Sequence, residues 1–178
     1  MKMAWGSTIN FIVIFMTLLL FAGFQNTFWY QIFGNIPAPL LWLNVVVYVM
    51  LYRKTLPSAL NVYLMGYALL AFTAMPLRMM WISLIILFAL VYLIKTRVFW
   101  SGSGYFTLMC AFSSVAFHIL YFLGSIFIEK KPASFEVIDR TIQLILTPTF
   151  AFPTYWILNK IDELSLDELT RESGGLEL

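Results

Sequence analysis

The run YFTLMCAFSSVAFHILYFLGSIFI, residues 105–128, contains no Asp, Glu, Lys or Arg. A helix that crosses the hydrocarbon core of a bilayer needs about 20 mostly apolar residues. The run is long enough, so it predicts a membrane-spanning helix. The rest of the chain has the same character, since 61% of its residues are hydrophobic and only 11% are charged. Soluble domains carry about 25% charged residues, so we expect an integral membrane protein.

Five further stretches are apolar enough, or nearly so, to cross a membrane. They lie at about 9–24, 39–52, 57–73, 77–94 and 138–158. The stretch at 39–52 is short, and we expect it to gain length from the preceding NIPAP segment, residues 35–39. The sequence therefore predicts an all-α bundle of about six transmembrane helices over residues 1–160. An acidic, solvated cytoplasmic tail is expected at 161–178, where Asp162 and Glu163 begin a series of carboxylates.

The positions of Lys and Arg predict the orientation, because cytoplasmic loops are enriched in both residues. If the N-terminus lies inside, the cations of the inner side are Lys2, Arg53, Lys54, Lys95, Arg97, Lys160 and Arg171. Those of the outer side are Arg78, Lys130, Lys131 and Arg140. The larger inner set favours both termini in the cytoplasm. The first span lacks a small-residue cleavage site of the secretory type, so we expect it to be a retained helix.

Polar residues in the 105–128 run recur at steps of three and four and so share one face of a helix. They are Thr107, Cys110, Ser114, His118, Tyr121 and Ser125. The remaining faces carry Leu108, Phe112, Val115, Ile119 and Phe122. A polar side chain is costly in lipid unless it faces the bundle interior. We therefore expect the polar face to point inward.

Other predicted helices offer partners for this face. The resulting interior polar set, expected to be structural or to contact a partner or ligand, is Asn44, Asn61, Ser114, His118, Tyr121, Gln143 and Thr147. Pro148 and Pro153 each remove a backbone donor and are expected to kink the last helix.

His118, the chain's single histidine, has three candidate roles: a structural hydrogen bond between helices, contact with a ligand or partner, and proton transfer. Proton transfer would need further ionisable groups deep in the membrane, and the central parts of the apolar stretches have none. No metal-ligand, nucleophile-elbow or phosphate-loop motif is found. We expect no catalytic, cofactor or metal site and, without a basic face, no nucleic-acid partner.

The segment FQNTFWYQIFGNIPAP, residues 24–39, is uncharged and dense in aromatic residues. Rings such as Trp29 and Tyr30 suit the headgroup level of a bilayer. We interpret the segment as an interfacial or re-entrant loop. A ligand-gripping lid or a docking surface for an outer partner is the alternative.

Five segments, in order, resemble the family of the bacterial rod-shape-determining protein MreD. They are NIPAPLLWLNVVVYV at 35–49, YRKTLPSA at 52–59, LMGYALL at 64–70, KTRVFW at 95–100 and TPTFAFPTYWILNKI at 147–161. The resemblance covers roughly residues 10–160. Many members carry an aspartate one turn after the glycine that matches Gly66, whereas this chain has Leu69 and Leu70 there.

The resemblance implies a non-enzymatic scaffold, multi-pass in the bacterial inner membrane and in contact with membrane lipid, that supports peptidoglycan synthesis and cell shape. Its expected partners are an MreC-type membrane-anchored protein and, through it, MreB, RodA and the RodA transpeptidase. Candidate partner surfaces are the small-residue face around Gly66 and the outer helix ends. The alternative is a substrate-binding subunit of an energy-coupling-factor vitamin transporter. Such subunits typically carry Ala-x-x-x-Ala in the first helix, and NFIVIFMTLLLFAGF, residues 10–24, has none.

Overall fold

The computed structural model describes residues 2–73, 75–98, 100–129 and 136–165. Over these residues the chain forms helices joined by turns and short extended segments, with no strand in the described part. The elements are α1 (Lys2–Gly23), the π-helix η1 (Phe24–Phe28), α2 (Trp29–Phe33), α3 (Leu41–Tyr52), α4 (Thr55–Leu69), α5 (Leu77–Arg97), α6 (Ser103–Ile128) and α7 (Val137–Ser165). Each of the six predicted apolar stretches is thus confirmed as a helix.

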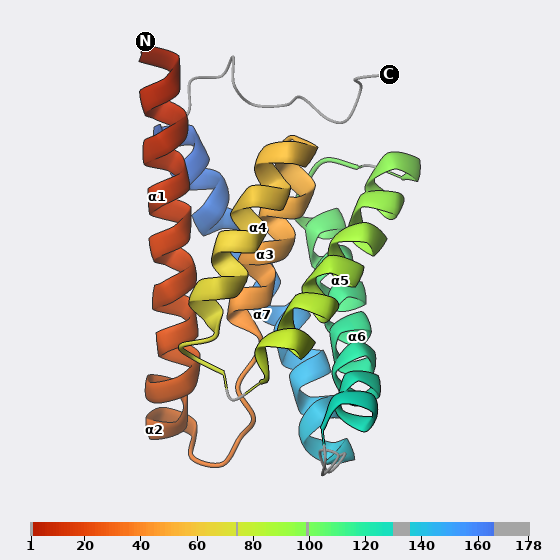
Figure 1. Cartoon of the computed structure of the whole chain (residues 1–178). Coiled ribbons are helices and arrows are strands. Elements are labelled where there is room, and N and C mark those ends of the chain that lie inside the picture. Colours follow the sequence, from red (N-terminus) through yellow and green to blue (C-terminus); the bar gives the residue numbers. More distant parts are fainter. Residues whose placement is uncertain (1, 74, 99, 130–135, 166–178) are drawn as a thin grey trace.

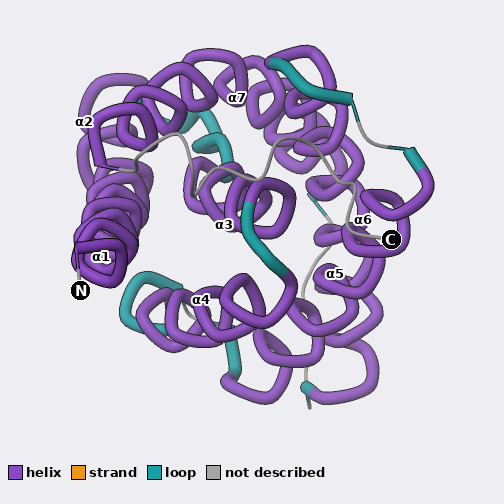
Figure 2. The backbone as a smooth tube through the Cα atoms, turned by 90° about the horizontal axis from the view of Figure 1, so that it is seen from above, coloured by secondary structure: helices purple, strands orange, loops and turns teal. Residues whose placement is uncertain are grey.

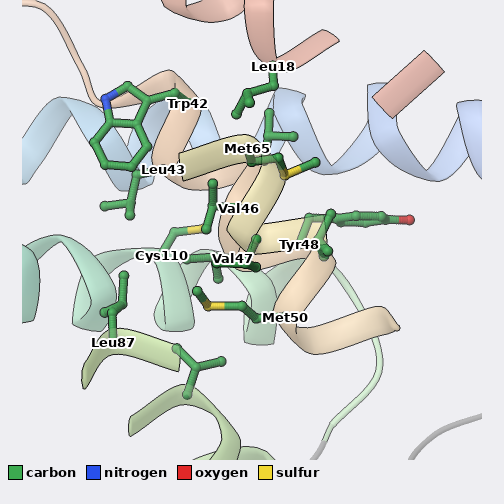
Figure 3. Close-up of a cluster of buried hydrophobic side chains, with 14 of the residues drawn as sticks. Leu18, Trp42, Leu43, Val46, Val47, Tyr48, Met50, Met65, Leu87 and Cys110 are labelled. Carbon is green, nitrogen blue, oxygen red and sulfur yellow. The ribbon is translucent and has the colours of Figure 1, made fainter. Parts of the chain in front are cut away.

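Helix α3 lies at the centre of a ring made by the other long helices (Figure 2). It contacts α1, α4, α5, α6 and α7, and each of these contacts its two neighbours around the ring. Every residue from Leu41 to Leu51 is buried. Side chains of this helix, Leu43, Val46 and Val47 among them, form the middle of the apolar core (Figure 3). A helix that is apolar on all sides is typical of such a buried position.

Within the described part of the chain, three stretches are long and apolar enough to cross a membrane: Asn10–Phe33, which joins α1, η1 and α2, and the helices α5 and α6. The protein is therefore an all-α membrane protein. Helix α3 has only 12 residues, which gives it a length of about 18 Å. A bilayer core is about 30 Å thick, so α3 ends short of that thickness.

The expectation that the NIPAP segment lengthens α3 is wrong. Residues 37–40 are buried but not helical. Pro37 and Pro39 have no N–H to donate, and each disfavours a helical conformation in the residue before it. The chain therefore enters the bundle in an extended form, and α3 begins only at Leu41.

The expected loop at 24–39 also differs from the structure, because helix continues through η1 and α2 to Phe33. Gly34 then has a φ of 61°, a value that favours glycine. Tyr30 is exposed, as a residue at the headgroup level would be. Trp29 is instead buried, and its Nε1 donates to the carbonyl of Ile36 at 2.8 Å. Its ring thus closes the α2 turn and does not face a headgroup.

The prediction for α6 is confirmed. The five apolar residues expected on its other faces are exposed, whereas Cys110, Ser114, His118 and Ser125 are buried. Thr107 and Tyr121 are half-buried.

Helix α7 runs obliquely from the far end of α6 to the start of α1 (Figure 1). Pro148 and Pro153 both lie inside this one helix. It continues to Ser165, beyond residue 160, at which the tail was expected to begin. The start of α1 and the end of α7 consequently lie at the same end of the bundle.

The small-residue face of α4 packs within the chain. A Cβ atom added to Gly66 would lie 2.6 Å from Cδ1 of Leu84 on α5 and 3.5 Å from the ring of Trp81. The glycine thus allows α4 and α5 to approach closely. This part of the face is already covered by α5.

Candidate functional site

Two clusters of buried and half-buried polar side chains lie at the two ends of α3. We call the first the amide network; it comprises Gln25, Asn44, His118, Arg140, Gln143 and Thr147. We call the second the carboxylate network; it comprises Asn10, Tyr48, Arg53 and Asp162. Both connect helices that are far apart in the sequence.

The amide network supplies partners to the backbone where α3 begins. The first amides of a helix have no partner inside it, and the hydrocarbon region of a membrane has no water to bind them. The N–H of Leu40 donates to Oγ1 of Thr147 at 3.0 Å, and that of Leu41 donates to Oε1 of Gln25 at 3.2 Å. Asn44 Nδ2 donates to the carbonyl of Thr147 at 3.1 Å. Side chains of α7 and η1 therefore hold the start of α3.

The π-helix places two amide side chains next to each other toward different helix ends. Gln25 caps α3, as described above. Asn26 Nδ2 donates to the carbonyl of Phe72, just after α4, at 2.6 Å. π-Helical turns are rare and frequently occur at functional sites. Here it lets one turn serve the start of α3 and the chain that leaves α4.

His118 connects α6 to α7 within the amide network. Its Nδ1 lies 2.7 Å from the carbonyl oxygen of Ser114, and its Nε2 lies 3.2 Å from Oε1 of Gln143. Gln143 Nε2 donates to the carbonyl of Ala38 at 3.1 Å, in the extended segment before α3. His118 is 6% exposed. Of its three candidate roles, this geometry supports the hydrogen bond between helices.

Arg140 extends the network toward the start of α7. Its Nη1 donates to Oε1 of Gln143 at 3.0 Å. The guanidinium also lies over the ring of Tyr121, 5.2 Å from the ring centre. A cation–π contact of this kind stabilises a partly desolvated cation.

The structure brings together most of the polar residues selected from the sequence, but not all. Asn44, Ser114, His118, Gln143 and Thr147 meet among α3, α6 and α7, and Tyr121 joins through Arg140. Asn61 lies half-buried on α4 and belongs to neither of the two networks as defined above. Four buried oxygens have no hydrogen-bond partner among the described residues: Asn44 Oδ1, Thr107 Oγ1, Ser113 Oγ and Ser114 Oγ.

Both prolines of α7 lie close to threonines whose hydroxyls bond back within the helix. Thr147, Thr149 and Thr154 donate to the carbonyls of residues 143, 145 and 150, at 2.7 to 2.8 Å. The carbonyls that the prolines deprive of a donor are those of residues 144 and 149. The hydroxyls therefore bind neighbouring carbonyls and not the two released ones.

The carboxylate network contains a buried ion pair that sequence reasoning missed. Asp162 is 2% exposed and pairs with Arg53. Its Oδ1 also accepts from Asn10 Nδ2 at 2.8 Å, and its Oδ2 accepts from the Tyr48 hydroxyl at 2.7 Å. Arg53 donates in addition to Oδ1 of Asn10 at 2.8 Å. The expectation that Asp162 belongs to a solvated tail is therefore wrong.

A sequence signal for Asp162 does exist. The buried face of α7 includes Thr147, Ala151, Thr154, Leu158 and Asp162, which follow each other at steps of three and four. Extending that period beyond the apolar stretch would have placed Asp162 on the inner face. Because Asp162 is charged and is followed by further acidic residues, it was assigned to the tail and not to the buried face of α7.

The carboxylate network also holds the turn between α3 and α4. Arg53 follows α3, and its backbone carbonyl accepts a bond from Lys95 Nζ at 3.0 Å. One arginine thus links α1, α7 and the end of α5. Each carboxylate oxygen of Asp162 has a donor, as a buried charge requires.

Among the described residues, no group of three or more His, Cys, Asp or Glu side chains could hold a metal ion. The contacts described above in the two polar clusters are hydrogen bonds, one ion pair and one cation–π contact. Comparison of the chain with models of protein families, with curated proteins and with solved structures gave no match.

Proposed function

We propose that the protein is a non-enzymatic scaffold of the bacterial inner membrane, which acts by binding another membrane protein. The observation that carries this proposal is the use of the buried polar side chains. In both networks they bond to other helices or to backbone groups at helix ends. Such bonds fix the shape of a bundle, and a fixed shape is what a docking platform needs.

We further propose that both termini lie in the cytoplasm. The carboxylate network joins Asn10 near the start of α1 to Asp162 near the end of α7. Arg53 and Lys95 lie at this same end, whereas Arg140 belongs to the amide network at the other end of α3. Enrichment of cations at the end that holds both termini is the pattern expected for a cytoplasmic side. The chain would then cross the membrane six times, and α3, whose helix is shorter than the bilayer core, would be sheltered from lipid by the ring.

The resemblance to the MreD family identifies the partner that we propose. It is an MreC-type membrane-anchored protein, which would connect the scaffold to MreB, RodA and the RodA transpeptidase. The face around Gly66 is covered by α5, so the partner should bind the exposed sides of the bundle. Positions with exposed apolar side chains on four helices are Leu60 on α4, Ile85 on α5, Leu108 on α6 and Ile145 on α7.

The test is purification of the tagged protein from its native membranes in mild detergent, with bound proteins and small molecules identified by mass spectrometry. The proposal expects a single-span periplasmic protein of the MreC type together with wall-synthesis enzymes. A photo-crosslinking residue at each of the four exposed positions would then locate the contact, and one at buried Leu43 serves as the control. Recovery of a nucleotide-hydrolysing transport module, or of a stoichiometric vitamin, would overturn the scaffold and favour the transporter subunit.

A further inference from the structure

The ring of His118 lies with both nitrogens against oxygens that only accept hydrogen bonds. Nδ1 is 2.7 Å from the backbone carbonyl of Ser114, and Nε2 is 3.2 Å from the amide oxygen of Gln143. A neutral imidazole has one N–H donor, and its other nitrogen is an acceptor. A neutral ring can therefore satisfy only one of these two contacts, whichever tautomer it adopts.

The orientation of the Gln143 amide is fixed by two partners other than His118. Its nitrogen donates to the carbonyl of Ala38 at 3.1 Å, and its oxygen accepts from Arg140 Nη1 at 3.0 Å. Turning the amide over would offer a donor to Nε2 of a neutral ring. It would also place the amide oxygen against the Ala38 carbonyl and the amide nitrogen against the guanidinium. No single orientation serves a neutral His118 and both other partners.

We infer that His118 is a proton-binding site that controls the hold of α7 on the segment before α3. Hydrogen bonds to both oxygens at once require the imidazolium, which donates from both ring nitrogens. When the ring loses its Nε2 proton, the Gln143 amide turns over. The Ala38 carbonyl and Arg140 then lose their bonds to Gln143.

Charged and titratable groups near this site come from α6 and α7. From α7, Arg140 shares the Gln143 oxygen with His118. Its guanidinium also lies over the Tyr121 ring of α6. Glu129, three turns along α6, is bonded to Ser125.

The other two helices that pack on α6 contribute apolar contacts near the ring. Trp42 of α3 meets Phe117 edge-on, with ring centres 5.1 Å apart. Met79 of α5 lies against Gly124, and Arg78 beside it is exposed. Of the charged groups named here, Arg140 is the one that bonds to the same amide oxygen as His118.

The test uses the full chain, because His118 is its single histidine. The protein is labelled with ¹⁵N in histidine and glutamine, purified through a tag without histidine, and studied by NMR in detergent between about pH 5 and pH 8. We expect both ring nitrogens to be protonated at the acid end. As the pH rises, Nε2 loses its proton, and the side-chain amide signal of Gln143, assigned with a Gln143→Asn variant, moves with the same midpoint.

Two NMR results would overturn the inference. One is a ring that keeps a single neutral tautomer throughout the pH range. The other is a titration of His118 that leaves the Gln143 amide unchanged, since the two groups would then be uncoupled. Both are read from the unsubstituted protein, so they do not depend on the folding of a variant.

Thermal unfolding gives a second, independent readout. If folding takes up a proton at His118, stability falls as the pH rises through the titration. The loss of about one hydrogen bond in a chain of this length lowers the midpoint of unfolding by about 2–4 °C. A His118→Gln variant should lose this dependence while Phe117→Leu, its neighbour, keeps it. An equal pH dependence in the wild type and in His118→Gln would contradict the inference.

Discussion

Replacing Asp162 by asparagine tests the carboxylate network, because the change removes one charge and hardly alters the shape. Arg53 would lose its ionic partner, and the Tyr48 hydroxyl would face an amide where it now donates to Oδ2 at 2.7 Å. Removing one member of a buried ion pair typically costs 3–5 kcal/mol. The Arg53 side chain is 15% exposed, which allows water to compensate part of the loss. We therefore expect a cost of about 3 kcal/mol in the free energy of unfolding, the lower end of that range.

The adjacent residue provides a matched control. Glu163 pairs with Lys160 at 3.2 Å, and their side chains are 43% and 69% exposed, so Glu163→Gln should cost less than about 0.5 kcal/mol. In thermal unfolding of the purified protein, Asp162→Asn should lower the midpoint by about 6–12 °C and the control by little. Combining Asp162→Leu with Arg53→Met should recover much of the loss, since no unpaired charge then remains. Equal effects of Asp162→Asn and Glu163→Gln would refute the reasoning.

Three further changes test the packing of the bundle by the same unfolding measurement. Thr147→Val removes the oxygen that accepts from the N–H of Leu40 and should lower the free energy of unfolding by about 1–3 kcal/mol. The control is Thr149→Val, which alters an exposed hydroxyl and should change stability by no more than about 0.5 kcal/mol. Gly66→Ala forces Leu84 of α5 to move and should lower the free energy of unfolding by about 1 kcal/mol. Gly104→Ala is the control, because the space around this residue is open, and it should leave stability unchanged. A loss of stability in Gly104→Ala as large as that in Gly66→Ala would contradict the packing argument. His118→Leu should lower stability by about 1–3 kcal/mol without removing a chemical step, so a stable variant that lost a transport or catalytic activity would disprove a structural role.

The helices could be predicted from the sequence because their signals are local. A long apolar run such as 105–128 requires a helix wherever it enters lipid. The inward face of α6 followed from spacing alone, since Ser114 and His118 recur at the helical period while Leu108 and Ile119 fall elsewhere. In both cases the physical cause of the structure lies within one segment.

The features that were missed depend on hydrogen-bond partners outside the segment itself. The period of α7 places Asp162 on the inner face, but the groups that pair with its charge there, Asn10, Tyr48 and Arg53, lie far away in the sequence. Trp29 is of a residue type that is common at the headgroup level. Its indole N–H instead donates to the carbonyl of Ile36, on the other side of the turn at Gly34. The spacing of residues within one segment does not predict which group elsewhere in the chain will be the hydrogen-bond partner.

The shortness of α3 explains why polar groups gather where they do. A helix of 12 residues ends inside the bundle at both sides, so its terminal backbone groups need partners where water is scarce. At one end Gln25 and Thr147 accept from its first amides. At the other, Arg53 is fixed by Asp162, and its own carbonyl is bound by Lys95. A full-length helix at the centre would need neither network. The polar side chains that first suggest a ligand site in this chain are therefore what a short central helix demands, and His118 is the member whose bonds depend on a proton.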